Sequence, residues 1–496
     1  MRRGLPPTWR TAASFLAICA GAFALRVLFI RSNADAAWPY SIFYYGDAQH
    51  FHAYASSLLR GVPYDNDLPF HPPGFAWLLA GLYQVLGASG GSRLSLKLVL
   101  AGLNAVTVGV AWLWWRRLLG GPWAVLAAVL LATHFGWLVF SATLNNEVLY
   151  ALWLTLTAAL TWHWRERLPW PGALAIGFVM AAGSLTRAEH LALWPFLLLF
   201  VLRERTRALP LRAHALRWGG AALLSVALLL PWAVRNAAAI GRYNERTASL
   251  EPMSRAVLVS SYGPVNFAIA NGAHADGGFR PDGLERLAGT AKLELADARV
   301  RELFIHGYAV GLRWLWENPG AAVSLLWRKL ERWLDGFRLG WGVSNLPGGL
   351  RGNRAPVDLF VPEGEWLRWP LAVLLAVGVA FSLRSAHRAF LLCSLVVAHR
   401  LVVTLLFFGY ARGLVVMLPV IVPLLLLPWT RLAAGPDRRW VPLGLAGAIV
   451  LGVGVEAAVV ASRAPRSYMA DGYIDGTTRK IIQDDWVRLW PSASDP

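Results

Sequence analysis

Long apolar runs, separated by short polar stretches, make up most of the chain. A helix that spans a bilayer needs about 20 mostly apolar residues, because the hydrocarbon core is about 30 Å thick. Candidate runs lie near residues 11–31, 94–115, 122–141, 147–164, 171–186, 188–202, 216–234, 367–384, 389–408, 413–429 and 440–461. This pattern predicts an all-α polytopic membrane protein with about eleven transmembrane helices, two of them short.

Two longer polar segments interrupt this series. The first, residues 32–93, contains an apolar stretch at 74–87 that is too short to cross a bilayer comfortably, so we expect an interfacial helix there. We therefore expect four regions: an N-terminal transmembrane core 1–234 that includes the first polar segment, a large polar segment 235–366 outside the membrane, C-terminal transmembrane helices 367–461 and an external tail 462–496. No internal repeat of the kind found in many secondary transporters is evident.

The first apolar run could be mistaken for a secretory signal peptide. Arg2 and Arg3 precede it, and small residues follow at Ala22 and Ala24. The run is longer than the usual signal core of about 7–15 residues. We therefore expect an uncleaved anchor with a cytoplasmic N-terminus.

Composition and charge placement exclude several classes of protein. Of the 496 residues, 56% are hydrophobic and only 15% are charged, against roughly 25% charged in soluble domains. The net charge of +18 suggests a polyanionic partner at first. However, most arginines lie in alternate short loops, beginning with the N-terminus, which is the bias that orients membrane proteins. The charge therefore requires no nucleic acid, and Cys19 and Cys393, far apart in apolar runs, form no disulfide framework or metal motif.

A carboxylate follows the first apolar run among aromatic residues and histidines. Asp47 is followed by His50 and His52, and His71 comes before Pro72-Pro73. A positioned carboxylate can act as a general base. Asp is also a preferred residue at helix N-termini, where it acts as a cap. The spacing leaves both interpretations of Asp47 open.

Further charged residues lie at the predicted membrane edge on the same side as Asp47. Glu147 begins a span, Arg187 and Glu189 join two short spans, and Tyr410 precedes Arg412 on a tight turn. Glu147 could be a solvated cap and Arg187 could reach the lipid headgroups. Arginine on this side goes against the orientation bias, and its planar group binds phosphate through two hydrogen bonds. These residues are therefore candidates for binding a lipid phosphate.

A basic amphipathic stretch, Trp327-Arg328-Lys329-Leu330-Glu331-Arg332-Trp333, lies in the large polar segment. It fits an interfacial helix that binds headgroups, and a lipid-phosphate site would use the same chemistry. His399-Arg400 lies within an apolar run, where we expect it to pair inside the bundle, and we assign it no functional role.

Several short motifs follow one another along the chain in an order that matches a known family. They are Gly46-Asp47-Ala48, Pro72-Pro73-Gly74, Asn145-Asn146-Glu147, Leu185-Thr186-Arg187-Ala188-Glu189, Pro231-Trp232-Ala233-Val234-Arg235-Asn236, Asn318-Pro319-Gly320 followed by Lys329, and Tyr410-Ala411-Arg412. In this order, over most of residues 10–430, the chain resembles the GT-C glycosyltransferases. It is most similar to bacterial relatives of the dolichyl-phosphate-mannose protein mannosyltransferases and of the aminoarabinose transferases that act on lipid A.

The resemblance implies 11–13 helices, external loops that form the catalytic cavity, and inverting sugar transfer from a polyprenyl-phosphate-sugar. It makes Asp47 the base or a metal-associated residue and Glu147 a second acidic catalytic position. Candidates for binding substrate are Arg187, Glu189, His71, Lys329, Tyr410 and Arg412. A divalent metal is possible, with Asp47 and His50 as candidate ligands, and no other cofactor is expected. Two departures from the family pattern are Phe51, where a Tyr is frequent, and His71, where the aminoarabinose transferases have Lys.

We therefore expect an inner-membrane glycosyltransferase that acts on the extracytoplasmic face, with a prenyl-phosphate donor, membrane lipid and an envelope acceptor as its partners. The alternative is a transporter or flippase for an anionic lipid or solute, which would use the same charges as a pathway across the membrane. A noncatalytic scaffold is a third possibility.

Overall fold

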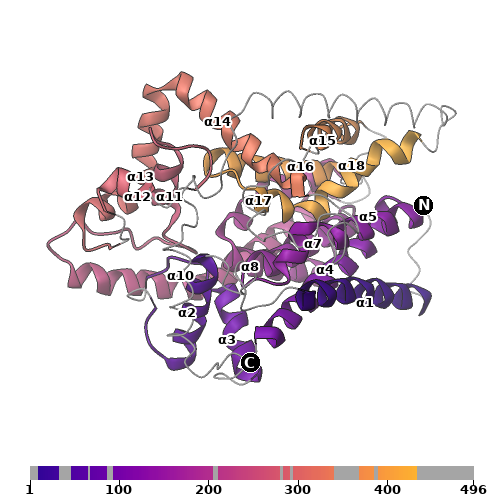
Figure 1. Ribbon diagram of the computed structural model, residues 1–496, viewed down its shortest axis with the longest axis horizontal. Coiled ribbons are helices and arrows are strands. Elements are labelled where there is room, and N and C mark those ends of the chain that lie inside the picture. Colours follow the sequence, from indigo (N-terminus) through magenta and orange to yellow (C-terminus); the bar gives the residue numbers. More distant parts are fainter. Residues whose placement is uncertain are drawn as a thin grey trace.

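The computed structural model describes residues 9–32, 46–64, 68–86, 93–204, 210–279, 283–290, 294–339, 368–384 and 389–432. In this part of the chain every regular element is a helix, as expected (Figure 1). The expected external tail and the run at 440–461 lie outside the described residues.

Among the described residues, three helices are long and apolar enough to cross a membrane by themselves. They are α1 (Trp9–Ser32), α4 (Arg93–Leu118) and α10 (Leu211–Arg246). Most other apolar runs form shorter helices: α5 (Gly121–Thr133), α6 (Phe135–Phe140), α7 (Glu147–His163), α8 (Trp170–Thr186), α9 (Trp194–Glu204), α15 (Arg368–Ser382), α16 (Leu391–Leu406), α17 (Ala411–Val415) and α18 (Leu418–Leu432). The structure is thus an all-helical chain with many apolar helices, while the predicted count of about eleven spans is not confirmed.

The shorter lengths arise because the chain leaves the α-helical conformation within one apolar run and at the junctions between others. The run at 122–141 divides into α5 and α6 at His134, whose Nδ1 accepts a hydrogen bond from the Gly136 amide at 3.1 Å. After α8 the backbone is extended at Arg187, and the 3-10 helix η2 (Ala188–Leu193) precedes α9. Between α16 and α17 the chain again leaves the helical conformation, at Phe407 and Tyr410.

These apolar helices pack into one bundle. Helix α4 contacts α1, α5 and α7, and α8 contacts α7 and α10. At the other side of the bundle α18 packs on α15 and α16, and α16 on α9. Large apolar side chains such as Leu16, Leu223 and Phe178 remain exposed on α1, α10 and α8. Such an apolar exterior is typical of helices that face hydrocarbon and not water.

The first polar segment forms α2 (Gly46–Arg60) and α3 (Gly74–Leu86), which pack on each other. The helix expected at 74–87 is therefore present. Its first residue lies against the end of α8: a β-carbon on Gly74 would come within 2.9 Å of the Leu185 carbonyl oxygen. Only glycine fits this approach without a shift of the backbone, and it brings the first polar segment beside Arg187.

The large polar segment contains α11 (Gly263–Ala270), α12 (Gly283–Ala288), α13 (Ala298–Glu317), α14 (Pro319–Leu334) and the 3-10 helix η3 (Asp335–Leu339). It shares a small hydrophobic core with the first polar segment, in which Phe70 contacts Phe304 edge to face. The Ser261 amide also donates a hydrogen bond to the Pro69 carbonyl at 2.8 Å. The end of the first polar segment therefore packs on the large polar segment, which we call the polar unit, whereas α2 and α3 bury apolar residues in the core of the bundle.

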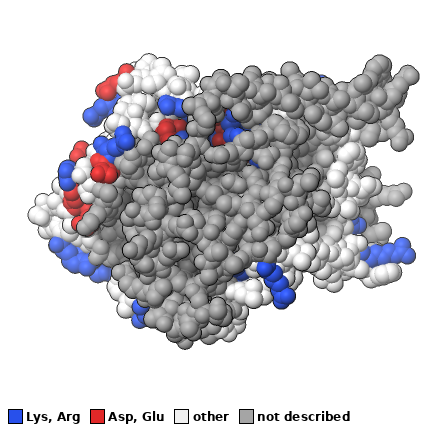
Figure 2. Space-filling view, viewed as in Figure 1, with Lys and Arg blue, Asp and Glu red and all other residues white. Residues whose placement is uncertain are grey.

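The charged side chains are unevenly distributed over the visible face of the molecule. In Figure 2 the visible Lys, Arg, Asp and Glu side chains gather toward the left edge, where Figure 1 places α10 to α13. On the right side of that view the described surface is white with separate blue patches of Lys or Arg, and no red is visible there.

Candidate active site

Five charged residues from distant parts of the sequence meet where helices begin or break. Asp47 lies in the first turn of α2 and Glu147 begins α7. Arg187 occupies the break after α8, Glu189 follows it in η2, and Arg412 lies on the short helix α17. We call these five residues, together with Arg400 of α16, the charged cluster.

One guanidinium nitrogen of the cluster joins two carboxylates. Arg412 Nη1 donates hydrogen bonds to Asp47 Oδ2 and to Glu147 Oε1, both at 3.0 Å. The ring of Tyr410 lies beneath this guanidinium, 4.9 Å from its centre. Such cation–π stacking leaves the hydrogen-bonding edge of the arginine free to bind oxygen. Arg412 is thus held between α2 and α7 by side chains on both.

A second arginine reaches the same oxygen of Glu147. Arg187 Nη1 donates to Glu147 Oε1 at 2.9 Å, and its Nε donates to Glu189 Oε1 at 3.0 Å. Glu189 is in turn bound by Arg400. The cluster is therefore continuous from Asp47 to Arg400, and charge-assisted bonds of this kind are stronger than neutral ones.

The accessibility of the side chains differs within the cluster. Glu147 is 1% exposed, Arg412 11% and Arg187 17%, whereas Asp47 is 40% exposed. Glu147 therefore lies beneath the two arginines, and Asp47 lies at the accessible edge. A ligand that approaches from this edge would meet Asp47 and the arginines before Glu147.

Asp47 has properties that a proton acceptor needs. Partial burial raises the pKa of its carboxyl above the usual range, while the nearby His50 and Arg187 act in the opposite direction. Oδ2 is bound by Arg412, and no hydrogen bond donated by the described residues reaches Oδ1. The helix dipole of α2 favours a carboxylate in this first turn, so capping contributes, but it does not account for the bond to Arg412.

His71 lies beside His50 in an aromatic environment. Its ring stacks on Tyr262, with centroids 5.8 Å apart, and lies 5.5 Å from the ring of His50. Burial, with a smaller effect of His50, lowers the pKa of His71 to about 3. At neutral pH this imidazole is therefore uncharged and can offer a phosphate only a single neutral donor.

Lys329 is not in contact with the charged cluster. Its ammonium group, on α14, donates to Asn271 Oδ1 at 2.7 Å and to the Leu405 carbonyl at 2.9 Å. Asn271 also donates to the Leu406 carbonyl, so the pair binds the last turn of α16. Burial lowers the pKa of Lys329 to about 7. Its role in holding a donor phosphate stays a prediction.

The side chains near Asp47 do not fit a divalent metal as they stand. Among the described residues, no group of three His, Cys, Asp or Glu side chains is placed to hold a metal ion. The two carboxylates that approach each other, Asp47 and Glu147, have Arg412 Nη1 between them. His50 is the other candidate metal ligand, and its Nδ1 is already within hydrogen-bonding distance of the Tyr64 hydroxyl, at 3.1 Å.

Three members of the site were not expected from the sequence alone. Arg400 had been given no functional role, and it pairs inside the bundle as predicted, but with Glu189 of the cluster. Asn146 Oδ1 accepts from Arg187 at 3.4 Å, and the ring of Tyr150 lies 5.5 Å from the Arg187 guanidinium carbon. Asn146 directly precedes Glu147, and Tyr150 follows it by three residues, about one helical turn. Their closeness to Glu147 in the sequence was therefore a signal that could have identified both as members of the site.

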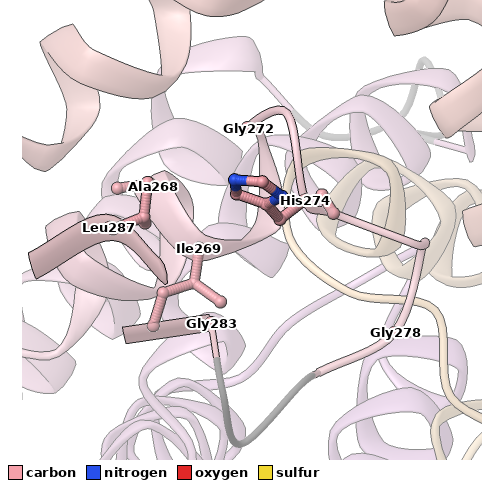
Figure 3. Close-up of a pocket in the computed structure, with 8 residues that line it drawn as sticks. Ala268, Ile269, Gly272, His274, Gly278, Gly283 and Leu287 are labelled. Carbon is pink, nitrogen blue, oxygen red and sulfur yellow. The ribbon is translucent and has the colours of Figure 1, made fainter. Parts of the chain in front are cut away.

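A separate pocket lies in the large polar segment (Figure 3). His274 points toward a wall formed by Ala268, Ile269 and Leu287, and the remaining lining residues are glycines and Ala275. Apart from His274, none of the side chains that line it is ionisable. It therefore lacks the cations that a phosphate group requires and does not form part of the charged cluster.

Comparison with known proteins supports part of the expected resemblance. Residues 70–234 match the family described as dolichyl-phosphate-mannose-protein mannosyltransferase. This range contains Glu147, Arg187 and Glu189, but neither Asp47 nor Arg412. A comparison with curated proteins finds no match.

Solved structures give weaker likenesses. The apo oligosaccharyltransferase of Archaeoglobus fulgidus is 14% identical, with a TM-score of 0.48, and the match covers 98% of this chain and 62% of that one. ArnT from Cupriavidus metallidurans, bound to undecaprenyl phosphate, is 15% identical with a TM-score of 0.35, covering 86% of this chain and 79% of that one. This chain spans about 62% of the length of the oligosaccharyltransferase.

The motif order and the family match agree in the segment where both apply. Glu147 at the start of α7 and Arg187 in the break after α8 are the residues that the motifs singled out there, and the structure joins them directly. The predicted resemblance to GT-C glycosyltransferases of the dolichyl-phosphate-mannose-protein mannosyltransferase type is confirmed over residues 70–234.

Proposed function

We propose that this chain is an inverting membrane glycosyltransferase, which moves a sugar from a polyprenyl-phosphate-sugar donor to an envelope acceptor on the extracytoplasmic face. The family matched by residues 70–234 takes its name from a donor of this chemical class. The apolar bundle gives a prenyl chain a hydrocarbon environment, and the charged cluster lies beside the polar unit. The identity of the sugar and the acceptor is not part of the proposal.

The observation that carries the proposal is the pair of arginines on one oxygen. Arg187 and Arg412 both bind Glu147 Oε1, at 2.9 and 3.0 Å, so their guanidinium groups are held close together. Two guanidinium groups side by side, with a buried carboxylate beneath, form a rigid site for an anion. The accessible carboxylate of Asp47 lies at the edge of this site.

The chemistry follows from these positions. The acceptor hydroxyl or amine attacks the anomeric carbon, and the bond between that carbon and the phosphate oxygen breaks. The electron pair of that bond stays on the prenyl phosphate, whose additional negative charge the two arginines stabilise. The acceptor proton passes to Asp47, whose Oδ1 receives no hydrogen bond from the described residues. Attack from the side opposite the phosphate inverts the configuration of the sugar.

The parts of the site contribute unequally. Phosphate is a competent leaving group, so positioning and preorganised charge supply most of the rate enhancement. Glu147 lies below the arginines and is almost fully buried, so we assign it a positioning role and not proton transfer. Glu189 and Arg400 extend the same support from η2 and α16.

The test uses the full chain, purified in lipid nanodiscs, with a panel of prenyl-phosphate sugars and an envelope extract as acceptor. Wild-type protein should release prenyl phosphate from at least one donor. Asp47→Asn and Arg187→Ala should both lower the rate at least about 100-fold. Arg313→Ala, an exposed arginine of α13 outside the cluster, is the matched control and should keep the wild-type rate.

Two results would contradict the proposal. One is wild-type turnover in both Asp47→Asn and Arg187→Ala. The other is wild-type protein that moves an intact prenyl-phosphate sugar or another anion between the two faces of a vesicle without cleaving it, which would favour a transporter.

A further inference from the structure

The position of Arg412 raises the question of which cation joins the two carboxylates. Arg412 Nη1 lies 3.0 Å from Asp47 Oδ2 and 3.0 Å from Glu147 Oε1. A bridging Mg²⁺, Mn²⁺ or Ca²⁺ would need both oxygens about 2.0–2.6 Å away. The guanidinium group occupies the space between these oxygens, so a metal could not bind there unless Arg412 moved away.

The charges of the cluster already balance. Three carboxylates, on Asp47, Glu147 and Glu189, are matched by three guanidinium groups, on Arg187, Arg400 and Arg412. Each carboxylate contacts at least one of these cations. In the site without its anionic ligand, a divalent ion added to this set would leave two uncompensated positive charges in largely buried surroundings, where charges are poorly screened.

The surrounding groups give a metal little help. His50 has its Nδ1 near the Tyr64 hydroxyl, and His71 is stacked on Tyr262. Glu147 Oε2, in contrast, is buried and has no hydrogen-bond partner among the described residues. If the guanidinium of Arg412 were removed, the carboxylates of Glu147 and Asp47 would face each other without a cation between them. Carboxylate oxygens are the ligands that a hard divalent cation prefers.

We propose that Arg412 takes the place of a divalent cation between Asp47 and Glu147, so that the site binds its anionic ligand through guanidinium groups and works without a metal. The inference rests on the proposed function for its activity test but not for its binding test. Arg412 then does two things: it holds the carboxylates of α2 and α7 together, and it presents a positive charge to the departing phosphate.

The experiment measures Mn²⁺ binding to the purified full chain by electron paramagnetic resonance of free Mn²⁺. Wild-type protein should bind no Mn²⁺ in a manner that depends on Asp47. Arg412→Met keeps an apolar stem but removes the charge, and it should bind one Mn²⁺ at least about tenfold more tightly than wild type. Adding Asp47→Asn to Arg412→Met should abolish that binding.

Arg400→Met is the matched control, because Arg400 belongs to the same cluster but contacts Glu189 and not the Asp47–Glu147 pair. It should gain no Mn²⁺ site. In the activity test, wild-type turnover should be unchanged by EDTA, and metal analysis of the active protein should find no stoichiometric divalent ion.

Three outcomes would overturn the inference. They are stoichiometric Mn²⁺ binding by wild type that Asp47→Asn removes, a folded Arg412→Met protein that binds no Mn²⁺, and wild-type transfer that stops with EDTA and returns with a divalent ion. If Arg412→Met does not fold, the wild-type measurements still decide. Wild-type protein that neither binds Mn²⁺ nor turns over any donor would contradict only the proposed function.

Discussion

The charged cluster and the Lys329 site bury cations in opposite ways. In the cluster, Arg187, Arg400 and Arg412 all contact carboxylates. Lys329 binds only the neutral oxygens of Asn271 and Leu405, and no carboxylate lies within ion-pair distance of it among the described residues. Burial without a counterion disfavours the charged form of a lysine, and accordingly the pKa of Lys329 falls to about 7.

This difference separates two uses of a buried cation. Arginines that share carboxylates stay charged and fixed in position, which is what an anion-binding site requires. A lone lysine on carbonyl oxygens can lose its charge, and its contacts serve to hold the end of α16. The four predictions below test this distinction, beginning with the largest expected effect.

Arg412→Ala should have the largest effect on transfer. It removes a preorganised cation from the departing phosphate, so the rate should fall by about 10²–10³-fold. Arg412→Lys keeps a charge but cannot bind both carboxylates and the phosphate in one plane, so it should recover only part of the loss. Release of prenyl phosphate measures both rates, and full activity in Arg412→Ala would remove this residue from the mechanism.

Asp47→Asn should lower transfer by about 10²-fold, the lower end of the range for a positioned base, because positioning and preorganised charge supply most of the rate enhancement. Only the ionised carboxylate can accept the acceptor proton, and partial burial raises the pKa of Asp47. The wild-type rate should therefore decrease as the pH is lowered. Because the pKa of Asp47 is raised, this decrease should begin at a pH higher than about 3.9, the pKa of an unperturbed Asp. A profile of kcat/KM without this acid limb would argue against the role.

Glu147→Ala should destabilise the protein by up to about 3 kcal/mol, because it removes the buried carboxylate that Arg187 and Arg412 share. Each arginine then keeps a single carboxylate of the pair that bound it, Glu189 for Arg187 and Asp47 for Arg412. Thermal denaturation in detergent, followed by circular dichroism, measures the change as a lower Tm. Glu147→Gln keeps the shape of the side chain and should give a smaller loss. For donor binding, Glu147→Gln should raise KM more than it lowers kcat, since Glu147 positions the arginines and does not transfer the proton.

Lys329→Met should have the smallest effect on transfer, within about threefold of wild type, a change of less than about 0.7 kcal/mol in barrier. Its clearest effect concerns stability. The pKa of Lys329 is about 7 in the folded chain and 10.5 for the free group, so between these values the unfolded chain binds more protons. Wild-type stability should therefore rise from pH 7 to pH 10, and Lys329→Met should lose this part of the slope.

The outcome for Lys329→Met also bears on the predicted phosphate-binding role. A loss of transfer as large as that of Arg412→Ala would mean that Lys329 reaches the donor after all. Asn271→Ala is a useful companion, because it removes one of the two oxygens that Lys329 binds while leaving the lysine in place.

The sequence predicted individual elements better than their junctions. The apolar runs at 11–31, 94–115 and 216–234 correspond to α1, α4 and α10, because length and hydropathy alone determine such helices. The breaks at His134 and Arg187 were not predicted as such, although Arg187 was placed between two short spans. A break depends on what the side chain finds in three dimensions, and Arg187 finds Glu147 and Glu189.

The candidate site shows the same limit. Motifs and charge placement singled out Asp47, Glu147, Arg187 and Arg412 one by one. Nothing in the sequence indicates that one nitrogen of Arg412 contacts residues 365 and 265 positions earlier. Arg400 could not be recognised either, because an arginine in an apolar run has many possible partners until the packing of α16 on η2 and α9 is known.

Helix α10 connects the bundle with the polar unit and has a mechanical consequence. Its 36 residues span about 54 Å at about 1.5 Å per residue, well beyond a hydrocarbon layer of about 30 Å. Near its far end Asn244 is bonded to Arg301 of α13 and to Met253. We therefore expect that a bilayer of different thickness would change the tilt of α10. Such a change would move the polar unit relative to the bundle.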